Sequence, residues 1–230
     1  MKQVSTQGIL LNRTNYGEAD RILSFITRDQ GKISVIAKGV RKAGAKLAGS
    51  IEPFSVSDLT IVEGRGEVGT LISARLIEHY GDIVKDIDRT HTAYDYLKLT
   101  NKATEARTEE AYFNLLREAL MSLNRLEDVP EVTSLWFRMQ LIKLAGHTPN
   151  LKTDESGDKL SERNLYNFDY DKMCFTLESK GEFNSGHIKF LRLGFEAKTP
   201  KIIQQIKNAS EYAQQTNSLI DSVFRSFIRN

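Results

Sequence analysis

The spacing of apolar residues changes once along this chain, from every second residue to about every third or fourth, near Tyr80 and Gly81. A period of two places alternate side chains on opposite faces of a strand, whereas a period of about 3.6 places apolar side chains along one face of a helix. The first part of the chain is therefore predicted to be β-sheet and the second part mostly helix. We place the domain boundary between residues 78 and 79, which gives domains of 1–78 and 79–230.

Five runs before this boundary have the alternation and composition of strands, with turn-forming residues between them. The connection between the third and fourth runs contains three glycines, so we expect an exposed, mobile loop over residues 39–50. Five antiparallel strands with a long loop at this point are typical of the OB-fold, a small five-stranded barrel; a small open sheet is the alternative. The runs are Gly8–Thr14, Arg21–Arg28, Lys32–Val40, Val56–Val62 and Val68–Ile77.

Beyond the boundary, helical spacing predicts helices over residues 90–106 and 108–126, a third from Pro130 to Gly146, and two more over 185–193 and 202–229. An irregular insert at about 148–181 interrupts them and contains a possible short hairpin, formed by residues 166–168 and 172–177. The predicted fold class is therefore α+β, with an N-terminal OB-fold barrel followed by a mostly helical domain.

Charge is distributed unevenly along the chain. Residues 1–50 hold nine basic and three acidic side chains, a balance of +6; because the whole chain carries +2, the remaining residues carry −4. Residues 30–51 contain five basic side chains and no acidic one. Such a stretch is typical of a surface that receives phosphates, since lysine and arginine neutralise their charge and glycine lets the backbone approach them closely.

The predicted DNA-binding residues are basic side chains of the first domain. A merely solvated charged loop is the alternative for all of them, as is common for charge runs. Tyr16, Phe25 and Phe54 are candidates for stacking on bases, although each could equally be a core residue. The basic candidates are Lys38, Arg41, Lys42, Lys46, Lys32, Arg13 and Arg21.

The sequence has none of the motifs that mark common enzyme classes. Its four histidines are widely spaced, and it lacks a P-loop, a nucleophile elbow and a dinucleotide fingerprint. We therefore expect no enzyme, no catalytic residue and no cofactor. The single cysteine, Cys174, can form neither an internal disulfide nor a metal framework. With neither a secretory signal nor an apolar run of membrane-spanning length, the protein is expected in the cytoplasm, associated with the nucleoid and not with a membrane.

Several ordered segments resemble the N-terminal domain of the RecO family of recombination mediators. The likeness is strong as far as about Glu78 and looser beyond it. The segments are Thr6–Leu11, Gly17–Leu23, Gly31–Lys32, Ala37–Arg41 and Leu47–Phe54.

The resemblance implies an OB-fold followed by a helical domain, and a protein without enzymatic activity that binds single- and double-stranded DNA and anneals complementary strands. It also implies cooperation with RecR in loading RecA recombinase, and binding of the acidic C-terminal tail of single-stranded DNA-binding protein. The third helix is where that tail is thought to dock in relatives. Partner-binding candidates here are Arg117, Trp136, Arg138 and Lys143.

Two departures from the family pattern affect these expectations. Many relatives carry a four-cysteine zinc module in the insert, but here the insert holds only Cys174, so we predict that zinc is absent. Relatives also tend to place arginine before the phenylalanine of the third helix, whereas this chain has tryptophan before Phe137. The way in which the acidic tail docks is therefore open.

Two other classes of function remain as alternatives. The helical domain could be the functional surface of a protein-interaction scaffold, which a pull-down would detect as partners without retention of DNA at low salt. A nuclease would need clustered acids near the basic face, which a metal-dependent cleavage assay would expose.

Overall fold

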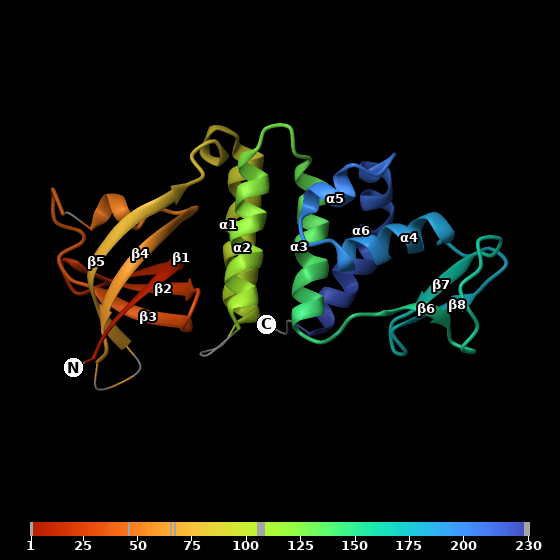
Figure 1. The fold of residues 1–230 in the computed structure, drawn as a ribbon, viewed down its shortest axis with the longest axis horizontal. Coiled ribbons are helices and arrows are strands. Elements are labelled where there is room, and N and C mark those ends of the chain that lie inside the picture. The colour runs from red at the N-terminus through yellow and green to blue at the C-terminus, as the bar shows by residue number, and fades with distance from the viewer. Residues whose placement is uncertain (1, 46, 65, 67, 105–108, 228–230) are drawn as a thin grey trace. The chain divides into compact units, whose positions relative to one another are not determined.

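The computed structural model of this chain describes residues 2–45, 47–64, 66, 68–104 and 109–227. Strands come first, helices follow, and a small sheet lies between the third and fourth α-helices along the chain (Figure 1). The chain divides into two compact units, Met1–Leu126 and Glu127–Asn230. The change from strands to helices falls near Tyr80, as expected, and the predicted domain boundary itself stays a prediction.

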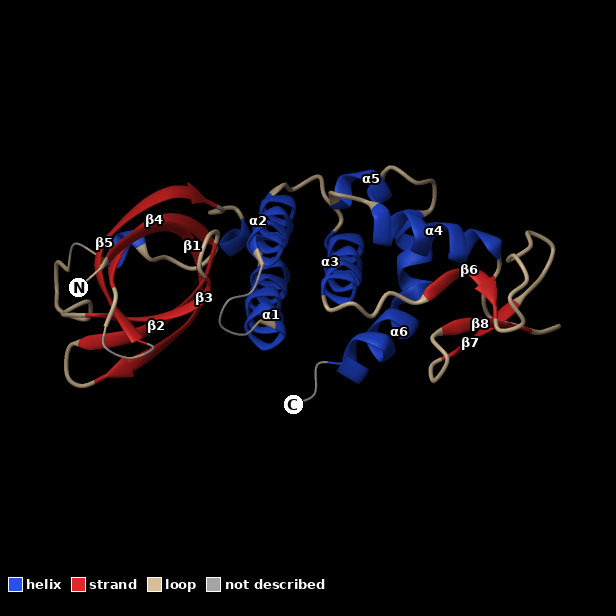
Figure 2. Ribbon diagram, turned by 60° about the horizontal axis from the view of Figure 1, so that its bottom comes forward, coloured by secondary structure: helices blue, strands red, loops and turns tan. Residues whose placement is uncertain are grey.

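The first unit begins with five strands that close into a barrel in the order β1-β2-β3-β5-β4, which Figure 2 shows as a ring. Neighbouring strands are antiparallel except β3 and β5, which are parallel. This arrangement confirms the predicted five-stranded barrel and excludes the open sheet. The strands are β1 (Gln3–Tyr16), β2 (Asp20–Thr27), β3 (Gly31–Ala37), β4 (Ser55–Val62) and β5 (Val68–His79).

The middle of β1 and the second half of β2 are buried on both of their faces. Leu10 and Phe25 belong to the apolar cluster of the barrel, yet Ile9 and Ile26, their neighbours in sequence, are also fully buried. Neighbouring residues of a strand point to opposite faces, so a second layer must cover the outside of this part of the barrel. The helices α1 (Ile87–Ala103) and α2 (Glu110–Asn124) pack there, with contacts to β1 and β2.

Two cations hold the C-terminal ends of these helices. The Arg89 guanidinium donates to two carbonyl oxygens: that of Leu123, in the last turn of α2, at 2.6 Å, and that of Leu126, just after α2, at 3.0 Å. The Lys32 ammonium donates to Asn101 O at 2.8 Å, in the last turn of α1. Carbonyls at a helix end have no partner within the helix, and the helix dipole there favours positive charge. Helix α1 begins at its cap Asp86, whereas Thr108, the predicted cap of the second helix, lies outside the described residues.

The second unit packs α3 (Pro130–Leu144) against α4 (Ser185–Glu196), α5 (Pro200–Gln204) and α6 (Ala209–Phe227). The proline start of α3 is as predicted, but the expected single helix over 202–229 is wrong. The chain turns between α5 and α6, where Asn208 has a φ of 62° that an α-helix cannot contain. Across the described residues, no helix is both long and apolar enough to cross a membrane.

The insert of the second unit is a three-stranded sheet in the order β6-β8-β7. Its strands are β6 (Asn150–Asp154), β7 (Tyr166–Asp169) and β8 (Cys174–Leu177). The antiparallel pair of β7 and β8 confirms the predicted hairpin. Aromatic rings pack edge to face between these strands, with ring centroids of Phe168 and Phe175 5.2 Å apart and those of Phe175 and Phe183 5.7 Å apart.

Replacing Gly8 by alanine should destabilise the barrel. An added Cβ would lie 2.6 Å from Leu59 Cδ1 and 3.3 Å from Phe25 Cδ1, both on core side chains that have no room to move. Overpacking of this kind costs about 1–3 kcal/mol of unfolding free energy, measurable by urea denaturation. Gly49→Ala is the matched control, because its Cβ would meet no atom within 4 Å. Equal stabilities of the two variants would contradict the packing described for the barrel.

Candidate nucleic-acid interface

The end of the barrel that carries the β1–β2 turn brings together two of the predicted arginines. Arg13 lies opposite Leu23 in the β1–β2 pair, and Arg21 lies opposite Asn15. Directly opposed residues of antiparallel strands point to the same face, and so do alternate residues of one strand. Arg13, Asn15 and Arg21 therefore share one face of the hairpin, where Arg21 Nε donates to Asn15 Oδ1 at 3.2 Å.

The basic segment Lys38–Lys42 follows β3 directly and lies against the same β1–β2 turn. Its backbone N–H groups reach the turn at two points: Gly39 N donates to Asp20 Oδ1 at 2.7 Å, and Arg41 N donates to Ala19 O at 3.0 Å. The Arg41 guanidinium also donates to Gly17 O, at 3.2 Å. Lys38, Arg41 and Lys42 are exposed. These three cations, together with Arg13 and Arg21, form what we call the basic mouth of the barrel.

The connection after β3 is not the wholly exposed loop that its glycines predict. Val40 is 5% exposed and belongs to the barrel core, as does Ile51 near the end of the connection. A short 3₁₀ helix, η1 (Ala48–Ser50), lies between them. The segment is thus anchored in the core by apolar side chains while its basic side chains stay in water.

Ion pairing separates the basic mouth from the other cations of the barrel. Within the described residues, no carboxylate lies within 4.0 Å of the charged nitrogens of the basic mouth. By contrast, three cations elsewhere on the barrel each pair with an acid, which satisfies part of their charge. These pairs are Lys2–Glu63 at 3.7 Å, Arg28–Glu110 at 3.1 Å and Arg75–Asp58 at 2.7 Å.

Two further predicted DNA-binding residues are not counted in the basic mouth, for different reasons. Lys46 lies outside the described residues. Lys32 is directed to the end of α1, where its ammonium donates to Asn101 O and, at 3.3 Å, to Thr104 O. These bonds give Lys32 a role inside the unit that a sequence cannot reveal, because they join residues about 70 positions apart.

The three aromatic candidates for base stacking differ in their exposure to solvent. Phe25 and Phe54 are each 1% exposed and belong to the core, so a stacking role for either of them is wrong. Tyr16 is 52% exposed at the end of β1, in the same β1–β2 hairpin as Arg13 and Arg21. Tyr16 therefore remains as a stacking candidate.

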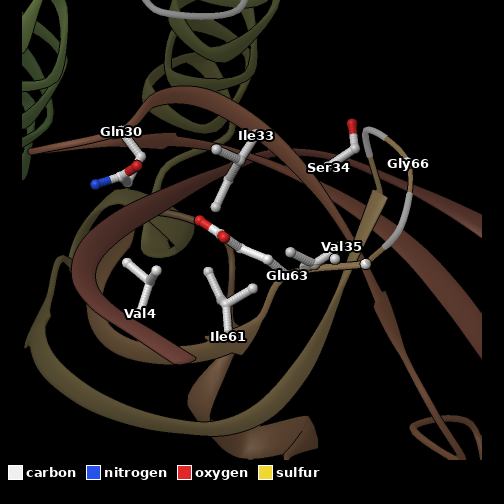
Figure 3. Close-up of a pocket in the computed structure, with 10 residues that line it drawn as sticks. Val4, Gln30, Ile33, Ser34, Val35, Ile61, Glu63 and Gly66 are labelled. Carbon is white, nitrogen blue, oxygen red and sulfur yellow. The ribbon is translucent and has the colours of Figure 1, made fainter. Parts of the chain in front are cut away.

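The opposite end of the barrel has a different chemical character. A pocket of about 300 Å³ lies there, near the start of β1, with Val4, Ile33 and Ile61 among its lining residues. Glu63 directs its carboxylate into this space, and Gln30 stands at its edge (Figure 3). Apolar walls with a carboxylate do not suit a phosphate, because the negative charges repel. The two ends of the barrel thus differ in the charged groups that they present.

The four partner-binding candidates all make contacts inside their own units. In the second unit, Trp136 is 2% exposed and donates from Nε1 to Ala197 O at 2.9 Å, so no partner reaches its ring in this conformation. Arg138 donates to Asn217 Oδ1 at 2.6 Å, and the Lys143 ammonium donates to Phe195 O at 2.8 Å, at the C-terminal end of α4. Partner binding by these residues stays a prediction.

Arg117, in the first unit, joins α2 to the barrel. Its guanidinium donates to both carboxylate oxygens of Glu78, and the Tyr80 hydroxyl donates to the same carboxylate at 2.5 Å. These bonds, led by the one from Arg117, lower the pKa of Glu78. Burial, followed by the bond to Glu78, raises the pKa of Tyr80 far above its usual range. The network is a structural tie between strand and helix.

The insert has few groups that could hold a zinc ion. Cys174 is its one thiol, and burial is the main cause that raises the pKa of this thiol, which disfavours the thiolate that zinc needs. Carboxylates close the turns instead: Asp154 accepts the N–H groups of Ser156 and Asp158, each at 3.0 Å. Among described residues, no group of three or more potential ligands is placed to hold a metal. The absence of zinc stays a prediction.

Comparison with known proteins gives the same family for the N-terminal part and for most of the chain. Residues 1–80 match the family model described as recombination protein O N terminal. A DNA repair protein RecO from Rubrobacter xylanophilus is 32% identical over 146 residues, which cover 64% of this chain and 58% of the relative. The protein of the same name from Bifidobacterium longum is 35% identical over 150 residues, covering 64% and 62%. The one from Syntrophus aciditrophicus is 28% identical over 227 residues, covering 94% and 87%.

The fold and the site first define a class: proteins with an N-terminal barrel of the OB type and a basic mouth, followed by helices. Within that class, the chain is similar to the RecO family, whose N-terminal model matches residues 1–80. The matched part covers less than two thirds of the length of the Rubrobacter and Bifidobacterium relatives. The activity and partners of this chain are therefore proposals.

Replacing Glu78 by glutamine tests the structural role of Arg117. The lowered pKa of Glu78 means that its carboxylate stabilises the fold at neutral pH and loses this contribution as pH falls through the folded-state value. We expect Glu78→Gln to cost about 1 kcal/mol at pH 7, because Arg117 is partly exposed and water screens the pair.

The difference from the parent protein should shrink as the pH is lowered towards about 3, in urea titrations at several pH values. Glu110→Gln is the control, since Glu110 and its partner Arg28 are both about half exposed. A loss for Glu78→Gln that does not change with pH would contradict this role.

Proposed function

We propose that this chain is a DNA repair and recombination protein that binds single- and double-stranded DNA without cleaving it. One observation carries the proposal: five cations lie around one end of an OB-type barrel with no carboxylate within ion-pairing distance among the described residues. Cations that release counterions from phosphates give affinity without regard to base sequence. The names of the RecO relatives, which are DNA repair proteins, support the same function.

The chemistry of the basic mouth suits annealing of complementary strands. Two strands repel each other through their phosphates, and cations that neutralise both reduce this repulsion so that bases can pair. No covalent bond changes in this process, so no catalytic residue, metal or cofactor takes part. The protein acts in the cytoplasm, at the nucleoid. It binds RecR and the C-terminal tail of single-stranded DNA-binding protein, and with them helps to load RecA recombinase on gaps.

Tyr16 gives the basic mouth a contact for unpaired bases. An aromatic ring stacks on any base, and such a contact contributes about 1–3 kcal/mol per base in single strands. Bases of a duplex are already stacked on each other and cannot use the ring. Tyr16 therefore favours the single strand, whereas the cations serve both forms of DNA.

Changing Lys38, Arg41 and Lys42 together to alanine should weaken binding of both single- and double-stranded DNA. Each phosphate contact that is lost lowers the slope of log affinity against log salt concentration by about 0.7–0.9. Fluorescence anisotropy with labelled oligonucleotides at several salt concentrations measures both quantities.

The matched control changes Lys198, Lys201 and Lys207 to alanine, which removes the same charge from exposed positions in the second unit. If the control weakens binding as much, net charge and not the basic mouth carries the affinity. An unchanged salt slope in the first variant would exclude the basic mouth as the DNA site.

Replacing Tyr16 by alanine should weaken binding of an oligothymidylate by about tenfold, while binding of a duplex of equal length changes little. Tyr16→Phe keeps the ring and should bind as the parent does. Equal losses for single strand and duplex would contradict stacking, as would a loss in Tyr16→Phe as large as that in Tyr16→Ala.

Annealing itself is tested with two complementary oligonucleotides, one with a fluorophore and one with a quencher. The parent protein should accelerate quenching with and without single-stranded DNA-binding protein, and the triple alanine variant should not. Partners captured by a protein that fails both to bind and to anneal DNA would instead support an interaction scaffold.

A further inference from the structure

A half-buried acidic residue at the β1–β2 turn contacts the basic segment. Asp20 is the first residue of β2, and its carboxylate accepts a hydrogen bond from Gly39, which follows Lys38. By Coulomb's law alone, this negative charge opposes the approach of a phosphate. The hydrogen bond that Asp20 accepts has the opposite consequence for binding, because it orders the basic segment.

Asp20 holds the backbone of the basic segment. Its Oδ1 accepts the Gly39 N–H at 2.7 Å, the short distance expected for a charged acceptor. Gly39 has a φ of 66°, in the left-handed region that glycine enters without strain, and this conformation aims its N–H at the carboxylate. Half-buried Gly39 would lose a partner that water replaces poorly if the carboxylate were removed.

Two backbone hydrogen bonds fix the residues after Gly39. Arg41 N donates to Ala19 O, and Lys42 N donates to Gly39 O at 3.0 Å, so this part of the segment is a hydrogen-bonded turn placed against the β1–β2 turn. The side chains of Lys38, Arg41 and Lys42 all project from this hydrogen-bonded part of the backbone. The position of their charges therefore depends on the bond between Asp20 and Gly39.

We infer that Asp20 is a positioning residue for DNA binding: its carboxylate clamps the Gly39 N–H and orders the basic segment before DNA arrives. The inference rests on the proposed function of the basic mouth. An ordered site binds more tightly because less conformational entropy is lost on binding. This gain exceeds the repulsion that the charge of Asp20 exerts on DNA, which water and salt screen at the surface.

The test compares three variants that separate charge from hydrogen bonding. Asp20→Ala removes both, and DNA affinity should fall by about three- to tenfold although the protein becomes more positive. Asp20→Asn removes the charge but keeps an oxygen that can accept the Gly39 N–H, so its affinity should equal or exceed that of the parent. Glu18→Ala removes the same charge from an exposed position in the same turn, and its affinity should also equal or exceed that of the parent.

Amide hydrogen exchange gives a readout that does not depend on DNA. The Gly39 amide should exchange faster in Asp20→Ala than in the parent, while exchange in Asp20→Asn and Glu18→Ala stays close to the parent rate. Thermal unfolding followed by circular dichroism confirms that each variant is folded before its affinity is read.

Three outcomes would overturn the inference: affinity at or above the parent in Asp20→Ala, equal losses in Asp20→Ala and Asp20→Asn, or unchanged exchange at Gly39. The proposed function fails separately, when the variant without Lys38, Arg41 and Lys42 binds DNA as the parent does. In that case faster exchange at Gly39 would still support the clamp but not its role in binding, and the inference would fall with the function.

Discussion

Closure of the barrel through a very short strand pair is the constraint on which the site depends. Among the described residues, β3 and β5 pair at three positions, Ser34–Ile36 with Val68–Thr70. The core behind this short seam is completed by Val40 and Ile51, which come from the connection between β3 and β4. Because these apolar side chains must be buried, the basic residues next to Val40 are held at the end of the barrel.

The same physical rules give different roles to cations that look alike in sequence. The ammonium groups of Lys32 and Lys143 donate to backbone carbonyls at the C-terminal ends of α1 and α4, where the helix dipole favours positive charge. Arg117 meets a carboxylate that links β5 to α2. The cations of the basic mouth have no carboxylate partner in the described part of the chain, although Arg21 and Arg41 each donate to an uncharged oxygen. Arg13, Lys38, Arg41 and Lys42 are exposed, and Arg21 is partly buried. The contacts made inside the fold thus distinguish cations that look alike in the sequence.

Local patterns were enough to predict much of the fold. Alternation along residues 21–28 and 56–62 identified β2 and β4, and Pro130 marked the start of α3. The five-stranded barrel followed from the number of strands and the long connection. The break between α5 and α6 was not predicted, because the helical spacing of apolar residues continues across Asn208. The backbone is not helical there, since Asn208 has a positive φ.

The site was predicted only in part. The number of charges in a segment can be read from the sequence, but the residues that those charges contact in the fold cannot. The acid-free stretch marked Lys38, Arg41 and Lys42, which are exposed, and their role in binding stays a prediction. The sequence could not show that Lys32 reaches α1 or that Phe25 and Phe54 are core residues. In the sequence, Asp20 is one of the three acidic side chains of residues 1–50 and has no visible contact. Its bond to Gly39 joins positions 19 residues apart through strand pairing, and no spacing rule reveals it.

The central claim is that DNA contacts the end of the barrel where the β1–β2 turn meets the segment after β3. Photo-cross-linking of a substituted oligothymidylate to the full chain, followed by mass spectrometry of the cross-linked peptides, locates the contact directly. The account predicts cross-links within residues 13–21 and 38–42. Cross-links confined to the second unit, Glu127–Asn230, would contradict it.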